Sequence, residues 1–258
     1  MKNYIPVQNS LDKALAFAPS LRADYFQRVH MHRPAGHINT IDTIEKLQGE
    51  GWFLQAVTEQ RGSSRKVESN QVRMYHPDLA MVKPNGDQEG TSNLYVSNSL
   101  MMNNMELALG FYRLVCSNGA VAYTGDRYKI KRHDDIEQHL NKIERDALEM
   151  IKDFDRLKEI ELSSDVQKTL AAKALDIRFG GMMARELDYR QLLKVNRPED
   201  EGNNVWAVFN RIQEGIIKPN MLTTKNGTPL NGVYDPAQNV MINQKLHANI
   251  VMPFTTVK

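Results

Sequence analysis

The chain has 258 residues, of which 41% are apolar and 25% charged, a composition that supports a buried core and excludes a compositionally disordered protein. The formal net charge is only +2, so any affinity for nucleic acid has to come from uneven placement of charge. One cysteine, Cys116, excludes an intrachain disulfide framework, and no apolar run approaches the about 20 residues that a membrane-spanning helix needs. Because the first residues lack a signal-peptide pattern, we expect a cytoplasmic protein that does not enter a membrane.

The first half of the chain predicts one early helix followed by strands. The helix is expected to begin at Asn39 or Thr40 and to end near Gly49, because its apolar residues recur at helical spacing. Strand composition is found at residues 52–60, 71–76 and 94–99. Residues 78–92, rich in Gly and Pro, predict an exposed excursion between the last two of these strands.

A β-meander is predicted from Phe111 to His133. Asn118-Gly119 is typical of a type I′ hairpin turn, since both central residues of that turn need a positive φ. Gly125-Asp126 predicts a second reversal. After it, cations alternate with apolar residues, so a strand here has one cationic face and one apolar face.

The second half of the chain, from Asp134 onward, predicts helices. A long helix over residues 134–161 has apolar residues at a/d spacing and carries ten acids against five Lys or Arg. Further helices are expected at residues 164–178, 184–193, 205–216 and 237–250, with a loop at 219–235. The predicted fold is therefore α+β: an N-terminal sheet region, residues 1–133, with an early helix, and a mostly helical region, residues 134–258, packed together as one globular unit.

Four stretches, in this order, resemble a phage and plasmid family known as domain of unknown function nine-three-two: GHINTIDTIEKLQGEGWFLQ, FYRLVCSNGAVAY, LLKVNRPEDEGNNVWAVFNRIQEGI and INQKLHANI. The resemblance extends from about His37 to Ile250. It implies an origin in a mobile element, hence a location in the cytoplasm of the host cell, and it leaves the biochemistry open.

No residues form a recognised catalytic constellation. The chain contains no phosphate-binding glycine loop, dinucleotide-binding loop or zinc-protease helix, so an enzyme is less expected than a binding protein, and no cofactor is predicted. His30, His32 and His37 lack partners at ligand spacing, so no metal site is assigned. Asn210, Gln213 and Glu214 form one polar patch on a helix, which is either a pocket or a structural lock in which Arg197 pairs with Glu214.

Two basic segments favour binding of single-stranded nucleic acid, if they lie on one sheet with tyrosines available for stacking. The candidate residues are Arg61, Arg65, Lys66, Arg73, Arg127, Tyr128, Lys129, Lys131 and Arg132. Tyr75, Tyr95 and Tyr123 are further candidates for stacking. In outline, a basic meander followed by a long helix is similar to phage single-strand annealing proteins, which assemble as oligomers, so we expect a homo-oligomer that serves recombination. The alternative is a non-enzymatic interaction protein whose acidic helix contacts and inhibits a host defence protein.

Overall fold

The computed structural model describes residues 5–22, 39–61, 67–82, 86, 88–99, 105–113, 121–130, 135–233 and 236–255. The chain divides into two compact units. The first comprises Met1–Tyr112 and Asp126–Leu148, and the second comprises Arg113–Gly125 and Glu149–Lys258. The long helix α4 (Asp135–Leu157) contributes its first part to one unit and its second part to the other. The sequence placed the boundary between two regions at Asp134, where the composition changes, whereas the two compact units divide within α4, between Leu148 and Glu149.

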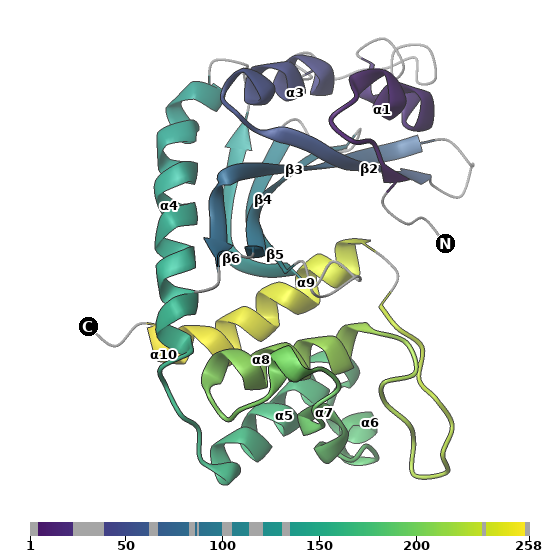
Figure 1. The fold of residues 1–258 in the computed structure, drawn as a ribbon. Helices are drawn as coiled ribbons and strands as arrows, with labels where there is room; N and C mark the ends of the chain where they lie inside the picture. Colours follow the sequence, from purple (N-terminus) through teal and green to yellow (C-terminus); the bar gives the residue numbers. More distant parts are fainter. Residues whose placement is uncertain are drawn as a thin grey trace. The chain divides into compact units, whose positions relative to one another are not determined.

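Six strands form one antiparallel sheet whose strand order is the order of the sequence (Figure 1). The strands are β1 (Ile5–Pro6), β2 (Phe53–Arg61), β3 (Val67–Val82), β4 (Gln88–Ser99), β5 (Met105–Arg113) and β6 (Val121–Ile130). Because neighbouring strands are antiparallel, they need no crossover. The connections from β2 to β6 are short, whereas the connection between β1 and β2 contains α1 and α3. The α+β fold predicted from the sequence, with an early helix, an antiparallel sheet and a helical second half, is confirmed.

Helices α1 (Leu11–Phe17) and α3 (Thr40–Gly49) cover one face of the sheet, together with the 3₁₀ turn Pro19–Leu21 (Figure 1). Alternation along the strands decides which side chains meet these helices: Val57, Val72 and Val96 are opposite one another on neighbouring strands and are fully buried. Ile44 and Leu47 of α3 are buried as the helical spacing predicts. Asn39 caps α3 by accepting a hydrogen bond from the Ile41 N–H (3.1 Å).

Two sequence predictions about the strands are wrong. Residues 78–82 continue β3 and residues 88–92 begin β4, so only residues 83–87 separate the two strands, instead of the whole of 78–92. The second reversal at Gly125-Asp126 does not exist, because β6 runs without interruption from Val121 to Ile130. A Gly-Asp pair permits a turn, but pairing with a neighbouring strand can hold the same residues extended. Asn118-Gly119 lies outside the described residues, between β5 and β6.

Apart from the first residues of β6, the regular structure of the second unit is helical. Its helices after α4 are α5 (Ser164–Phe179), α6 (Gly181–Arg185), α7 (Arg190–Leu193), α8 (Val205–Ile217), α9 (Pro236–Leu246) and α10 (Met252–Thr255), with a 3₁₀ turn at Pro198–Asp200 and a π-helical turn at His247–Val251. Ser163 and Asn204 cap α5 and α8, each by accepting a hydrogen bond from a backbone N–H of the first turn. The helix expected at residues 184–193 is instead divided between α6 and α7 by residues 186–189.

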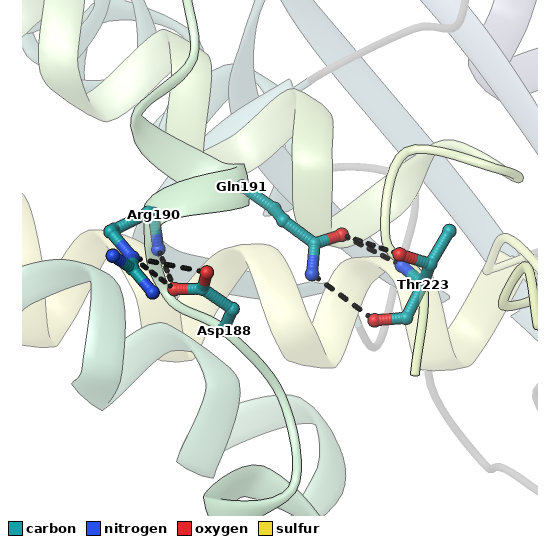
Figure 2. Close-up of polar contacts among 4 residues, drawn as sticks. All are labelled: Asp188, Arg190, Gln191 and Thr223. Carbon is teal, nitrogen blue, oxygen red and sulfur yellow. Dashed lines mark hydrogen bonds and ion pairs between the residues drawn. The ribbon is translucent and has the colours of Figure 1, made fainter. Parts of the chain in front are cut away.

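Helix α8 is the centre of the second unit, since all thirteen of its residues are buried. Trp206 packs against Phe154 of α4 with ring centroids 4.7 Å apart. After α8, residues 219–233 form a hairpin-like arm: the Leu230 N–H donates to the Leu222 carbonyl, and the Asn220 N–H donates to the Leu230 carbonyl. The side-chain amide of Gln191 holds this arm by pairing with the backbone of Thr223, to which it both donates (3.1 Å) and accepts (2.8 Å) (Figure 2).

Candidate functional site

The sequence-predicted nucleic-acid residues fall into three groups in the structure. Arg61 is the last residue of β2, Arg73 lies in the middle of β3, and Arg127, Tyr128 and Lys129 lie near the end of β6. The remaining four predicted cations, Arg65, Lys66, Lys131 and Arg132, lie outside the described residues. They belong to the segments that directly follow β2 and β6 in the chain.

Strand direction brings the ends of β2 and β6 to the same end of the sheet. In an antiparallel meander, alternate connections lie at the same end, so the end of β2, the start of β3, the end of β4, the start of β5 and the end of β6 are neighbours. The pairing of β2, β3 and β4 supports this arrangement. Arg61 at the end of β2 pairs with Val67 at the start of β3, and Ser69 near that start pairs with Ser99 at the end of β4. At a spacing of about 4.8 Å between strands, β2 and β6 are roughly 19 Å apart.

Arg73 is not part of this end of the sheet. It pairs with Ala56 on β2 and Tyr95 on β4, six residues beyond the start of β3, which corresponds to about 20 Å along the strand. Its side chain is half-buried, and its Nε atom is shielded from solvent. The structure therefore separates Arg73 from the other candidate cations, although the sequence places it in the same basic hairpin.

Lys129 is exposed, whereas its neighbours Tyr128 and Ile130 are buried, in agreement with the predicted alternation of a cationic and an apolar face. The expectation that Tyr128 offers its ring to bases is wrong, since only 4% of the residue is exposed. Its hydroxyl donates to Asp146 of α4 (2.5 Å), and the ammonium of Lys142 lies 4.8 Å from its ring centroid. Tyr95 is equally unavailable for stacking at 1% exposure. Burial removes the apolar surface of both rings from water, which stabilises the fold.

A buried polar network adjoins this end of the sheet, and sequence reasoning missed it. Glu59, Asn70 and Asn98 form a row across β2, β3 and β4. Asn70 Nδ2 donates to the Ser20 carbonyl (3.1 Å), and Asn98 Nδ2 donates to Thr40 Oγ1 (2.9 Å). Glu59 Oε1 accepts from the Ser20 N–H (2.9 Å). The row thereby ties the Pro19–Leu21 turn and the start of α3 to the sheet, which is the role of a structural lock rather than of a reaction centre.

The polar patch predicted on α8 is also a lock. Glu214 is 4% exposed and forms ion pairs with Lys218 and with Arg197, the partner that the lock alternative assigned to it. The Asn210 amide donates to the Trp206 carbonyl (2.7 Å), and the Gln213 amide donates to Asn243 of α9. Two alternatives were open at the level of sequence, a pocket or a lock, and these contacts favour the lock. Arg211, also buried, had no sequence signal beyond its place between Asn210 and Gln213.

His247 is a second buried ionisable residue that sequence reasoning did not find. It begins the π-helical turn and meets the ring of Phe154 edge-on, with centroids 6.5 Å apart. Burial lowers its pKa from 6.5 to about 4. The imidazole is therefore neutral at physiological pH and serves as an interior aromatic residue.

In the described part of the chain, no three His, Cys, Asp or Glu side chains are grouped to hold a metal ion, and His30, His32 and His37 lie outside it. None of the helices in the described ranges is both long and apolar enough to span a membrane.

The comparisons with known proteins agree with the resemblance noted in the sequence. Two proteins of Escherichia coli (strain K12), the UPF0380 proteins YafZ and YfjQ, are each 26% identical to this chain over 201 residues, which cover 70% of the chain and 67% of each relative. No solved structure matches the chain. The family model "Domain of unknown function (DUF932)" matches residues 36–245. Because this match covers most of the sequence, the chain belongs to the DUF932 family.

Proposed function

We propose that this protein of a mobile element binds single-stranded nucleic acid at the end of the sheet where β2 and β6 terminate, and that it holds the strand for annealing during recombination. The observation that supports this proposal is the strand order: it places Arg61 and the end of β6, beside which Lys129 is exposed, at the same end of one sheet. Each of these strand ends continues directly into a cationic segment of the sequence, with Arg65 and Lys66 in one and Lys131 and Arg132 in the other.

The chemistry of such an interface is that of phosphate contacts. Tyr95 and Tyr128 are buried, so stacking on bases would not come from these rings. Affinity would then rest on Lys and Arg neutralising phosphates, a contribution that does not depend on base sequence and that falls as salt rises. We therefore expect weak sequence preference and a steep dependence of the Kd on ionic strength.

The test is a charge reversal in β6, Lys129→Glu, measured by fluorescence anisotropy with a labelled single-stranded oligonucleotide. An ion contact in water is worth about 1 kcal/mol, and reversing the charge replaces this attraction by a similar repulsion. The Kd should therefore rise roughly thirtyfold at 50 mM salt, and the salt slope should flatten by roughly 0.7 per lost contact. The matched control is Lys173→Glu, which makes the same charge change at an exposed position of α5.

Two results would contradict the proposal. One is the absence of binding by the wild-type chain to any oligonucleotide at low salt. The other is an equal loss of affinity in both variants, because this would show a response to net charge rather than to the end of the sheet. Absence of binding, together with co-purification of a host protein, would favour the alternative of an interaction protein that inhibits a host defence factor.

We also propose that copies of the chain associate head to tail through opposite charges. Exposed Lys129 on β6 and exposed acids of α4, such as Glu137 and Glu149, are the kinds of groups that such a contact would use. A heterologous contact of this kind closes into rings or continues as filaments. Light scattering should give an oligomer whose mass falls as salt rises, and a mass near 29.5 kDa at both low and high salt would refute the assembly.

A further inference from the structure

Arg211 is an unusual buried cation at the centre of the second unit. Only 5% of the residue is exposed, and its Nε and Nη2 atoms are shielded from solvent. Neither nitrogen has a hydrogen-bond partner in the part of the chain that the structure describes. A buried guanidinium with unused donors is costly, because those donors lose their bonds to water without a replacement.

The two unused nitrogens are on the same edge of the guanidinium. In arginine, the Nε–H and one Nη2–H bond point in parallel, away from the side-chain stem, and together they form a fork that matches two oxygens of one carboxylate or phosphate group. A single planar edge left without partners therefore has the shape of a bidentate oxyanion site. Scattered unused donors on different edges would have no such complementarity.

The charges around Arg211 favour an anion as well. Arg211, Glu214 and Lys218 occupy positions i, i+3 and i+7 of the chain, so they lie along one face where α8 ends, and the turn that carries Arg197 and Asp200 packs on α8. Glu214 is paired with both Arg197 and Lys218. Burial lowers the pKa of Arg211, while the charge of Asp200 raises it. Glu199 of the same turn is exposed, and among the charged residues that are buried or half-buried, three cations and two carboxylates leave one positive charge in excess.

We propose that this cluster, defined by Arg197, Asp200, Arg211, Glu214 and Lys218, binds a small oxyanion, a phosphate or carboxylate group, whose two oxygens accept hydrogen bonds from Nε and Nη2 of Arg211. The side chains of Arg197 and Lys218 are 15% and 19% exposed, so these two cations connect the cluster with solvent and attract an anion toward it. The site uses none of the residues proposed to hold nucleic acid.

The test is titration of the full chain with inorganic phosphate, and separately with acetate, at an ionic strength held constant with chloride. Calorimetry should detect one site per chain, and the melting temperature should rise by about 5–10 °C at a hundredfold excess over the Kd. Arg211→Lys keeps the charge but removes the fork, and it should weaken binding at least tenfold. Arg185→Lys, at an exposed position of α6, is the matched control and should bind as the wild type does.

Failure of the wild-type chain to bind either anion beyond the chloride baseline would overturn the proposal, and this result does not depend on whether a variant folds. Equal binding by folded Arg211→Lys would overturn it too. The two proposals are separable, because Lys129→Glu should leave phosphate binding unchanged, whereas Arg211→Lys should leave the salt slope of oligonucleotide binding unchanged.

Discussion

The buried imidazole of His247 predicts a specific loss of stability in mild acid. Its pKa in the folded chain is about 4, against 6.5 when it is unperturbed, because burial disfavours the charged form. Between these two values the unfolded chain binds a proton that the folded chain does not. The free energy of unfolding therefore has its full value above pH 6.5 and falls as the pH is lowered toward 4.

The magnitude follows from the two pKa values. A difference of about 2.5 units corresponds to roughly 3 kcal/mol when the pH is below both of them, at 1.36 kcal/mol per unit. Between pH 7 and pH 5, the same linkage gives a loss of about 2 kcal/mol. For a chain of this size, that loss would lower the melting temperature by about 4–8 °C.

The measurement is urea unfolding of the wild type and of His247→Leu at pH 7, 6 and 5, which separates this residue from the other groups that titrate. The difference in unfolding free energy between the two proteins should shift by about 2 kcal/mol in favour of the variant as the pH falls from 7 to 5. A proton NMR titration of the His247 ring should give a midpoint near 4. A difference in stability that is constant across this pH range would refute the argument, since it would show that the imidazole titrates alike in both states.

Three further predictions concern packing and buried polar contacts, and each is measured as a change in unfolding free energy. Asn70→Ala removes the hydrogen bond to the Ser20 carbonyl and leaves that carbonyl buried, so it should lower the unfolding free energy by about 2–4 kcal/mol. Gln71→Ala, on the opposite face of β3, should lower it by about 1 kcal/mol or less. Equal losses would show that Asn70 does not have the structural role assigned to it. Gly232→Ala should destabilise by about 1–3 kcal/mol, because the new Cβ would lie 2.7 Å from the Pro219 backbone nitrogen, whereas Gly49→Ala meets open space and should be neutral or slightly stabilising. Glu214→Ala should cost about 3–5 kcal/mol by leaving two cations without their carboxylate, and a cost below 1 kcal/mol would show that those cations find other partners.

Elements whose signals are local were predicted well. The helices that begin at Thr40, Ser164 and Val205 each follow a capping residue, Asn39, Ser163 or Asn204, whose side chain accepts a hydrogen bond from the first turn. Such a bond depends on residues within four positions of one another, so the sequence contains all the information that it requires. The apolar spacing of α4 likewise predicted its buried side, where Ile136, Ile143 and Ala147 are fully enclosed.

The sequence predictions were wrong where pairing with a strand distant in the sequence determines the conformation of a segment. Gly125-Asp126 and residues 78–92 have the composition of turns, yet residues 78–82, 88–92 and 125–126 lie in strands, since pairing between strands compensates for a weak local preference. For the same reason the sequence alone could not tell that Arg73 lies about 20 Å along β3 from the other cations, because register is a property of two strands together.

The sequence by itself determined the class of fold, the starts of α3, α5 and α8, and the family to which the chain belongs. It left open whether Glu214 lies in a pocket or pairs with Arg197, and the structure shows the pairing. Only the tertiary structure decided which polar residues are buried. Tyr128 was expected at the surface, yet it lies in the interior, where its hydroxyl donates a hydrogen bond to Asp146. Arg211 and His247 lose their contact with water only when α8 and the π-helical turn pack into the second unit. Burial depends on every element that surrounds a side chain, so it follows from the assembled fold and not from the residues beside it in the chain.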